Sequence, residues 1–179
     1  YYAILGVNCV IVPVNPMLQV DEISFILRDS NIKAIFASSD ILNTVDTALK
    51  KNKCMSIPII SINYLDYIKK RFIVKLPKEF ENKCNNNNIR KKNWKDIVES
   101  KALNFHHDNK PDAVCIIPYT SGSTGKPKGC IHTHNTVNAV INAYAKWLPI
   151  PKKSKVLTTL PLFHVTGMQH SLNAIIYSG

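Results

Sequence analysis

The chain has 179 residues, of which 45% are hydrophobic and 20% are charged, the balance of an ordinary folded domain. Its apolar runs are much shorter than the roughly 18 residues of a membrane-spanning helix, and no secretory leader opens it. Its five cysteines are widely spaced and form no C-x-x-C pair. These features exclude a disordered chain, a membrane span, a disulfide framework and a thiolate metal site, and we expect a cytoplasmic protein.

The net charge of +11 is concentrated in one segment. Residues 50–101 hold fourteen Lys or Arg against five Asp or Glu, a surplus of nine. A nucleic-acid-binding patch interleaves such charges with aromatic residues or places them on a recognition helix, whereas here they accompany asparagine. We therefore interpret residues 63–111 as a basic, Asn- and Lys-rich surface insertion and expect no nucleic acid partner. A nucleic-acid-binding module is the alternative.

The first part of the chain, residues 1–62, alternates strand and helix patterns. A continuous apolar run over 9–14, followed by Asn15 and Pro16, predicts a buried strand. A helix, a strand, a helix and a strand are predicted next, over residues 21–31, 33–37, 41–49 and 57–62. This β-α-β-α-β order is typical of the α/β class, in which helices cover a parallel sheet.

The last part, residues 112–179, surrounds a loop rich in glycine. A strand over 112–118 leads into the loop at 119–129, and a short strand continues to residue 131. A helix over 135–147, a strand over 156–160 and a helix from Met168 are predicted next. Within the insertion we expect one helical stretch, around residues 94–101.

The loop concentrates groups that bind anions. Its glycines let backbone N–H groups turn toward one point, its hydroxyls add donors and its lysines add positive charge, which suits a polyphosphate. The Walker pattern is absent, because Lys126 is followed by Pro127 and the first glycine position holds Thr120. The extended pattern after Pro127 predicts that no helix N-terminus faces the anion, and the hydrolase motif G-x-S-x-G is missing.

The ten residues from Thr120 to Gly129, TSGSTGKPKG, resemble the signature of the adenylate-forming enzyme superfamily. Two flanking segments resemble its neighbouring motifs in the same order: residues 2–16, with YAILG and VPVNP, and residues 160–168, LPLFHVTGM, in the form usual for fatty-acyl-CoA ligases. The resemblance implies part of the large N-terminal domain of such an enzyme, with parallel-sheet layers flanked by helices. Both ends look cut and later nucleotide motifs are missing, so we expect an internal fragment that is inactive alone.

Enzymes of this type convert ATP and a carboxylic acid into an acyl-adenylate and pass the acyl group to a thiol, commonly that of coenzyme A. The resemblance implies these co-substrates and Mg²⁺, with Thr120 assigned to the metal, and a fatty or other hydrophobic acid. Lys128 takes the constant, catalytic lysine position, whereas the position of Lys126 varies in the family. The phosphates are placed against Thr120, Ser121, Gly122, Ser123, Thr124, Gly125, Lys126 and Lys128.

Beyond the loop, the resemblance places His164 at the wall of the acyl pocket, as a catalytic and substrate-contacting residue, with packing beside Phe163 as the alternative. Gly167 and Met168 would open the helix that lines this pocket, with Leu172 as a further contact, although core packing explains these apolar residues equally well. His132 and His134 share one strand face, as paired metal ligands do, but no third ligand is near. We assign both histidines to a strand-to-helix connection.

Three other functions are compatible with the sequence. Within the superfamily, an aryl-acid ligase or an amino-acid-activating domain would carry the same loop. A non-catalytic relative is the third, and the intact loop argues against it. The oligomeric state is not predicted.

Overall fold

The computed structural model describes residues 1–68, 91–100, 108–121 and 125–179. Most of the predicted insertion, residues 69–90 and 101–107, lies outside the described residues, as do three predicted phosphate ligands, Gly122, Ser123 and Thr124. The chain divides into two compact units. Unit 1 comprises Tyr1–Asn15 and Asn104–Gly179, and unit 2 comprises Pro16–Leu103.

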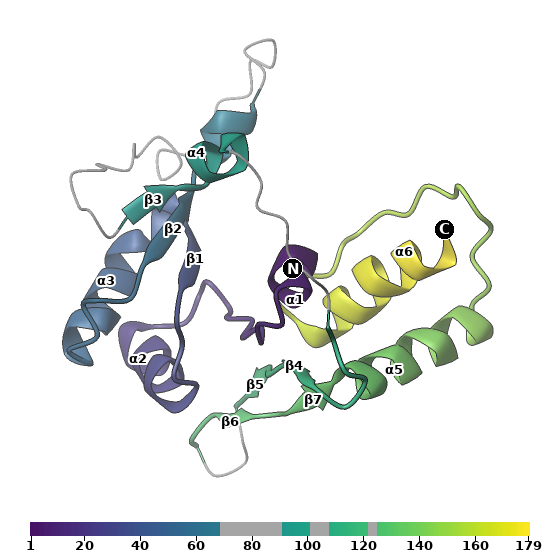
Figure 1. The fold of residues 1–179 in the computed structure, drawn as a ribbon, viewed down its shortest axis with the longest axis horizontal. Helices are drawn as coiled ribbons and strands as arrows, with labels where there is room; N and C mark the ends of the chain where they lie inside the picture. Colours follow the sequence, from purple (N-terminus) through teal and green to yellow (C-terminus); the bar gives the residue numbers. More distant parts are fainter. Residues whose placement is uncertain (69–90, 101–107, 122–124) are drawn as a thin grey trace. The chain divides into compact units, whose positions relative to one another are not determined.

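Unit 2 contains the parallel sheet that the strand and helix pattern predicts. Strands β1 (Ile35–Ser38), β2 (Ile59–Ile62) and β3 (Lys91–Asn93) lie side by side in that order (Figure 1). The helical elements are α2 (Val20–Asp29), η1 (Ser39–Ile41), α3 (Leu42–Lys51), η2 (Tyr64–Tyr67) and α4 (Trp94–Glu99). The helices predicted over 21–31, 41–49 and 94–101 and the strands predicted over 33–37 and 57–62 are therefore confirmed, within a few residues at their ends.

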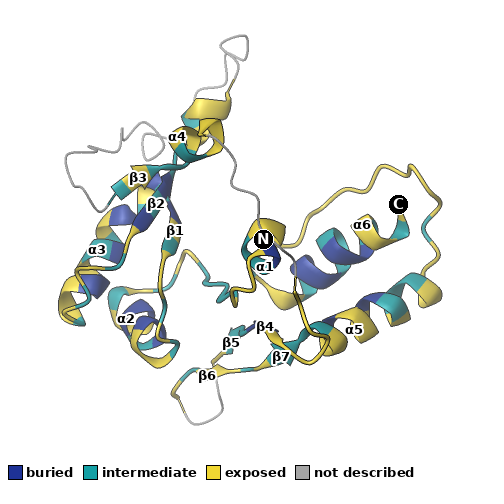
Figure 2. Cartoon of the chain, viewed as in Figure 1, coloured by how far each residue is buried: buried dark blue, intermediate teal, exposed yellow. Residues whose placement is uncertain are grey.

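Helices α2 and α3 pack together through apolar faces with helical spacing (Figure 2). The buried apolar residues are Ile23, Ile26 and Leu27 of α2 and Leu42, Val45, Ala48 and Leu49 of α3. The Ser24 hydroxyl donates to Asn52 Oδ1 (3.0 Å), and Asn52 Nδ2 donates to the Ser24 carbonyl (2.7 Å). These two bonds fix the end of α3 against α2.

Unit 1 combines short antiparallel strand pairs with longer helical segments. Strand β4 (Val114–Ile116) pairs with β7 (His132–Thr133), and β5 (Tyr119–Thr120) pairs with β6 (Lys128–Gly129). Helix α1 (Tyr2–Gly6) opens the unit, α5 (His134–Trp147) follows β7, and the π-helix η4 (Gly167–Asn173) continues into α6 (Ala174–Ser178). Their buried core consists of Cys115, Ile116, Val137, Ile141, Met168 and Ala174.

Helix α5 begins with a capping box. The Thr133 hydroxyl accepts the N–H of Thr136 (3.3 Å), and the Thr136 hydroxyl accepts the N–H of Thr133 (3.0 Å). We expect Thr133→Ala to lower the free energy of unfolding by about 1 kcal/mol, because it leaves the N–H of Thr136 without its partner. Thr133→Ser, which keeps the hydroxyl, should stay close to wild type in urea denaturation. Equal losses in both variants would contradict this role.

Two predicted strands are wrong. Residues 9–14 form only a single bridge, in which the Ile11 N–H donates to the Cys115 carbonyl (2.9 Å) and the Ile11 carbonyl accepts from Ile117 (2.8 Å). Cys9 and Val10 are exposed, and Pro13 has no N–H with which to extend the ladder. Residues 156–160 are exposed and belong to no strand of the described chain, because apolar β-branched sequence forms a strand only where a neighbouring strand pairs with it.

Candidate functional site

The glycine-rich loop is the turn of an antiparallel hairpin. Tyr119 pairs with Gly129 and Thr120 pairs with Lys128, so residues 121–127 connect β5 to β6. The chain after Pro127 is extended, as predicted, and a helix begins only at His134. Gly125 has a φ of +81°, a left-handed conformation that favours glycine. The loop therefore meets any ligand with its own amides, hydroxyls and lysines.

Thr120 and Lys128 stand at the base of this loop on one face of the hairpin. Directly opposed residues of an antiparallel pair project to the same side, about 5 Å apart at their Cβ atoms. Both side chains are exposed, as are Ser121, Gly125 and Lys126. Side chains cover the backbone of Gly129, because a Cβ there would lie 2.9 Å from Ile117 Cγ2 and 3.2 Å from Tyr119 Cζ. The hairpin thus places a hydroxyl-bearing and an ammonium-bearing side chain on the same face.

The charged residues in the sequence that contains and follows the loop are all positive. Residues 113–179 contain six lysines and neither Asp nor Glu. Lys126 and Lys128 belong to this acid-free stretch, so no carboxylate after Asp112 competes for them. The exposed Ser121, Lys126 and Lys128, with the backbone amides beside them, form the kind of donor set that phosphate oxygens require.

His164 lies at the exposed start of the last helical segment. Its N–H donates to the Pro161 carbonyl (3.0 Å), and its Nδ1 accepts the N–H of Thr166 (3.3 Å). The bond from Thr166 leaves Nε2 as the ring nitrogen that can face a ligand. The structure therefore places His164 at the surface rather than in the core beside Phe163.

Gly167 and Met168 are both buried. A Cβ on Gly167 would lie 2.3 Å from the Pro161 carbonyl oxygen and 2.9 Å from its carbon, so this turn admits no side chain. Met168 is 4% exposed and belongs to the core of unit 1, and Leu172 is half-buried. Packing alone explains why Gly167 and Met168 occupy these positions. Their contact with substrate stays a prediction.

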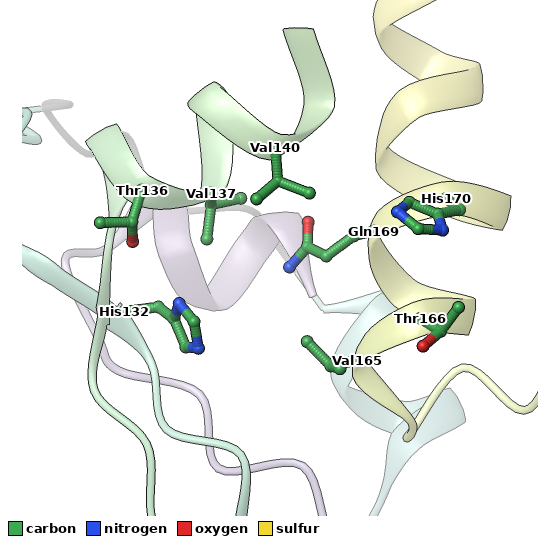
Figure 3. A pocket seen from close by; sticks show the side chains of 8 residues that line it. All are labelled: His132, Thr136, Val137, Val140, Val165, Thr166, Gln169 and His170. Atoms are coloured by element: carbon green, nitrogen blue, oxygen red, sulfur yellow. The ribbon is translucent and has the colours of Figure 1, made fainter. Parts of the chain in front are cut away.

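A cavity of about 210 Å³ lies between α5 and the segment that carries the π-helix (Figure 3). The surface that faces the cavity is mainly apolar. Figure 3 shows Gln169 extending from the helix toward α5, with Val165 below it. The lining residues are His132, Thr136, Val137, Val140, Val165, Thr166, Gln169 and His170. Sequence reasoning predicted a pocket beside this helix but named none of these residues as its lining.

Two contacts hold the polar side chains of the cavity in place. Asn173 Nδ2 donates to Gln169 Oε1 (2.8 Å), and the same Asn173 bonds the hydroxyls of Tyr1 (3.1 Å) and Tyr2 (2.7 Å). The His170 ring stacks on Tyr144, with centroids 4.4 Å apart and planes 9° from parallel. Burial raises the pKa of the Tyr1 hydroxyl, although its hydrogen bond to Asn173 opposes this, so the group stays neutral.

The histidines of the strand-to-helix connection lie where the sequence places them. His132 is on β7 and His134 is the first residue of α5. Within the described part of the chain no group of three His, Cys, Asp or Glu could hold a metal ion. The nearby Cys115 is buried, which raises the pKa of its thiol and keeps it protonated and unreactive.

One known protein family matches the chain over its whole length. The model of the AMP-binding enzyme family matches residues 1–179. A long-chain-fatty-acid–CoA ligase of Mycobacterium tuberculosis is 26% identical over 178 residues, which are 99% of this chain and 29% of the ligase. A malonate–CoA ligase of Arabidopsis thaliana is 40% identical over 67 residues, 37% of this chain and 11% of the ligase. The chain thus spans less than a third of the length of these two relatives.

Solved structures share the fold. ATP-bound MatB from Rhodopseudomonas palustris superimposes with a TM-score of 0.71 at 16% identity, over 98% of this chain and 30% of MatB. An anthranilate CoA ligase in complex with anthranoyl-AMP gives a TM-score of 0.72 at 17% identity, over 99% of this chain and 30% of that protein. These likenesses confirm the predicted α/β fold of an adenylate-forming enzyme.

Proposed function

The chain belongs to the AMP-binding enzyme family, and from this premise we propose that its protein activates a carboxylic acid with ATP and transfers the acyl group to coenzyme A. The observation that carries the proposal is the hairpin, which pairs Thr120 with Lys128, both exposed, at the base of the glycine-rich loop. The chain spans less than a third of the length of the two ligases it matches, and we assign the remaining nucleotide contacts of the proposed reaction to none of its residues.

The hairpin loop would hold the β- and γ-phosphates of ATP. When the carboxylate attacks the α-phosphorus, the bond to the pyrophosphate oxygen breaks and negative charge grows on the leaving group. Donors fixed in advance stabilise that charge most strongly where it develops. Lys128 would supply the cation, and the hydroxyls and amides of residues 120–125 would supply hydrogen bonds.

Magnesium fits this loop only in part. The loop offers the Thr120 hydroxyl and backbone groups but no carboxylate, so phosphate oxygens and water would complete the octahedral shell of Mg²⁺. When bound, the ion would neutralise charge on the phosphates. Thr120 and Lys128 would orient the same phosphates from the hairpin.

The cavity between α5 and the last helical segment would hold the acyl group. Its mainly apolar surface, with Val137, Val140 and Val165, suits a hydrocarbon chain or ring. Its volume is about 210 Å³, and it opens to solvent, since Val140 and Val165 of its lining are 45% and 36% exposed. His164, which lies one residue before Val165, would face the carboxylate end through Nε2. We therefore propose a hydrophobic acid as the substrate.

The proposal is tested by the products that the full-length protein forms. Incubated with ATP, coenzyme A and one of three acids, it should form the adenylate and the thioester of hexanoate or benzoate, detected by mass spectrometry. Malonate, with a second charge, should be a poor substrate, because its desolvation in an apolar cavity is costly. A preference for malonate would contradict the assigned cavity, and no adenylate from any acid would contradict the proposed activity.

Val140→Asp tests the cavity itself. The new carboxylate would lie in the apolar wall, and we expect kcat/KM for hexanoate to fall roughly 10-fold to 100-fold while the KM for ATP is unchanged. Ala139→Asp is the matched control, because both residues are exposed on α5 but only Val140 lines the cavity. Equal kinetics for the two variants would show that the acyl group binds elsewhere.

A further inference from the structure

A basic, partly apolar segment begins in the last turn of helix α5 and takes no part in the proposed reaction. We call residues 146–155, with the sequence KWLPIPKKSK, the basic tip. Figure 1 shows that α5 leads away from β7 and that this segment continues from its far end. Figure 2 shows that the segment is mostly exposed. All four of its lysines are exposed: Lys146, Lys152, Lys153 and Lys155.

The local sequence gives the basic tip a restricted backbone. Helix α5 ends where the Leu148 N–H donates to the Tyr144 carbonyl (2.8 Å), and two prolines follow at 149 and 151. The Pro151 carbonyl accepts both the N–H (3.2 Å) and the hydroxyl (2.6 Å) of Ser154. A fixed φ at each proline and a closed turn reduce the entropy that binding has to remove.

Exposed apolar side chains accompany these lysines. Trp147 is 81% exposed and Leu148 is 46% exposed, directly beside Lys146. Tryptophan is enriched at the boundary between water and a lipid bilayer, where its ring lies among the headgroups. Lysine side chains at such a boundary lay their methylene stems along apolar surface and reach toward anionic groups.

The charged residues of unit 1 near the basic tip in the sequence are positive. Its two segments, residues 1–15 and 104–179, contain seven lysines, no arginine and only two acidic residues, Asp108 and Asp112. Both aspartates precede β4 in the sequence, whereas four of the seven lysines are in the basic tip. An anionic partner therefore complements this surface. Nucleic acid is disfavoured, because bidentate recognition of nucleic acid favours arginine, which unit 1 lacks.

We propose that the basic tip docks the protein on the surface of an anionic lipid bilayer. Trp147 and Leu148 enter the headgroup region, while Lys146, Lys152, Lys153 and Lys155 pair with lipid phosphates. The proposed docking is at the bilayer surface; among the described residues no helix is long and apolar enough to cross a membrane. It does not depend on the proposed enzymatic activity, and it uses no residue of the loop or the cavity.

The test is cosedimentation of the full-length protein with vesicles. We expect binding to vesicles of phosphatidylcholine mixed with phosphatidylglycerol, weaker binding at higher salt and little binding to phosphatidylcholine alone. The variant Lys152→Gln, Lys153→Gln, Lys155→Gln should bind on the order of 100-fold more weakly, since each lysine near an anionic surface contributes about one kilocalorie per mole. Trp147→Ala should bind roughly 10-fold more weakly.

Matched controls come from exposed residues of unit 2. Lys33→Gln, Lys50→Gln, Lys95→Gln removes the same charge, and Met17→Ala removes a side chain that is 80% exposed. Both controls should bind as the wild type does. Unchanged binding of the basic-tip variants would overturn the proposal. So would a wild-type protein that ignores anionic vesicles but binds a single-stranded RNA, because the tip would then be a nucleic-acid surface.

Discussion

Replacing Gly167 with alanine should destabilise unit 1 by about 3 kcal/mol or more. The added Cβ would lie 2.3 Å from the Pro161 carbonyl oxygen and 3.0 Å from that of Leu160. Both neighbours are backbone atoms, so the chain itself would have to move. The displaced segment joins His164 to the core residue Met168. We expect equilibrium urea denaturation to show the loss, together with reduced adenylation.

Gly125→Ala is the matched control for this substitution. Apart from Gly125 and its two chain neighbours, no atom of the described residues lies within 4 Å of a Cβ at Gly125. Its cost therefore comes from the φ of +81° and should be about 1–2 kcal/mol. Comparing the two substitutions separates the steric cost of a side chain at Gly167 from the conformational cost of one at Gly125. An unfolding midpoint of Gly167→Ala equal to that of wild type would contradict the close packing at Pro161.

Lys128→Ala should lower the rate of adenylation by roughly 100-fold to 1,000-fold, the loss typical when one group that stabilises developing charge is removed. Thr120→Ala should cost about 10-fold, since it removes a neutral donor from the same face of the hairpin. The KM for the acid should change little in either variant, because the loop would contact only the phosphates. Single-turnover formation of acyl-adenylate measures the effect directly.

Lys126→Ala is the control for the lysine at the base of the hairpin. Lys126 lies within the connecting loop, whereas Lys128 is paired with Thr120 in β6. Both lysines are exposed and have the same charge, so only their positions differ. We expect Lys126→Ala to reduce the rate less than 10-fold. Similar losses in the two variants would mean that the loop acts by its charge alone.

The helices and the parallel strands could be predicted because their signals are local. Apolar spacing identifies α2 and α3, and short apolar runs identify β1 and β2. The two wrong strands, at 9–14 and 156–160, have equally apolar sequences. A strand also needs a partner, and Ile11 meets β4 only once while residues 156–160 pair with no strand of the described chain. Pairing between distant segments is not encoded in either run alone.

The loop and the cavity of the candidate site also differ in how far the sequence predicts them. The loop is a contiguous motif, so its composition predicts an anion site and its resemblance predicts the ligand. The cavity is assembled from β7, α5 and a π-helix, whose extra residue per turn departs from the 3.6-residue spacing used to assign faces. Gln169 is held by Asn173, which contacts Tyr1 across 172 positions of sequence. Local sequence patterns do not predict a contact between residues so far apart in the chain.

The central claim is that the hairpin loop holds the phosphates of ATP while a carboxylic acid is activated. Acid-dependent exchange of labelled pyrophosphate into ATP by the full-length protein tests it most directly. We predict exchange with hexanoate, none without an acid, retention in Lys126→Ala and near-complete loss in Lys128→Ala. Exchange that proceeds without any acid, or at the wild-type rate in Lys128→Ala, would contradict the claim.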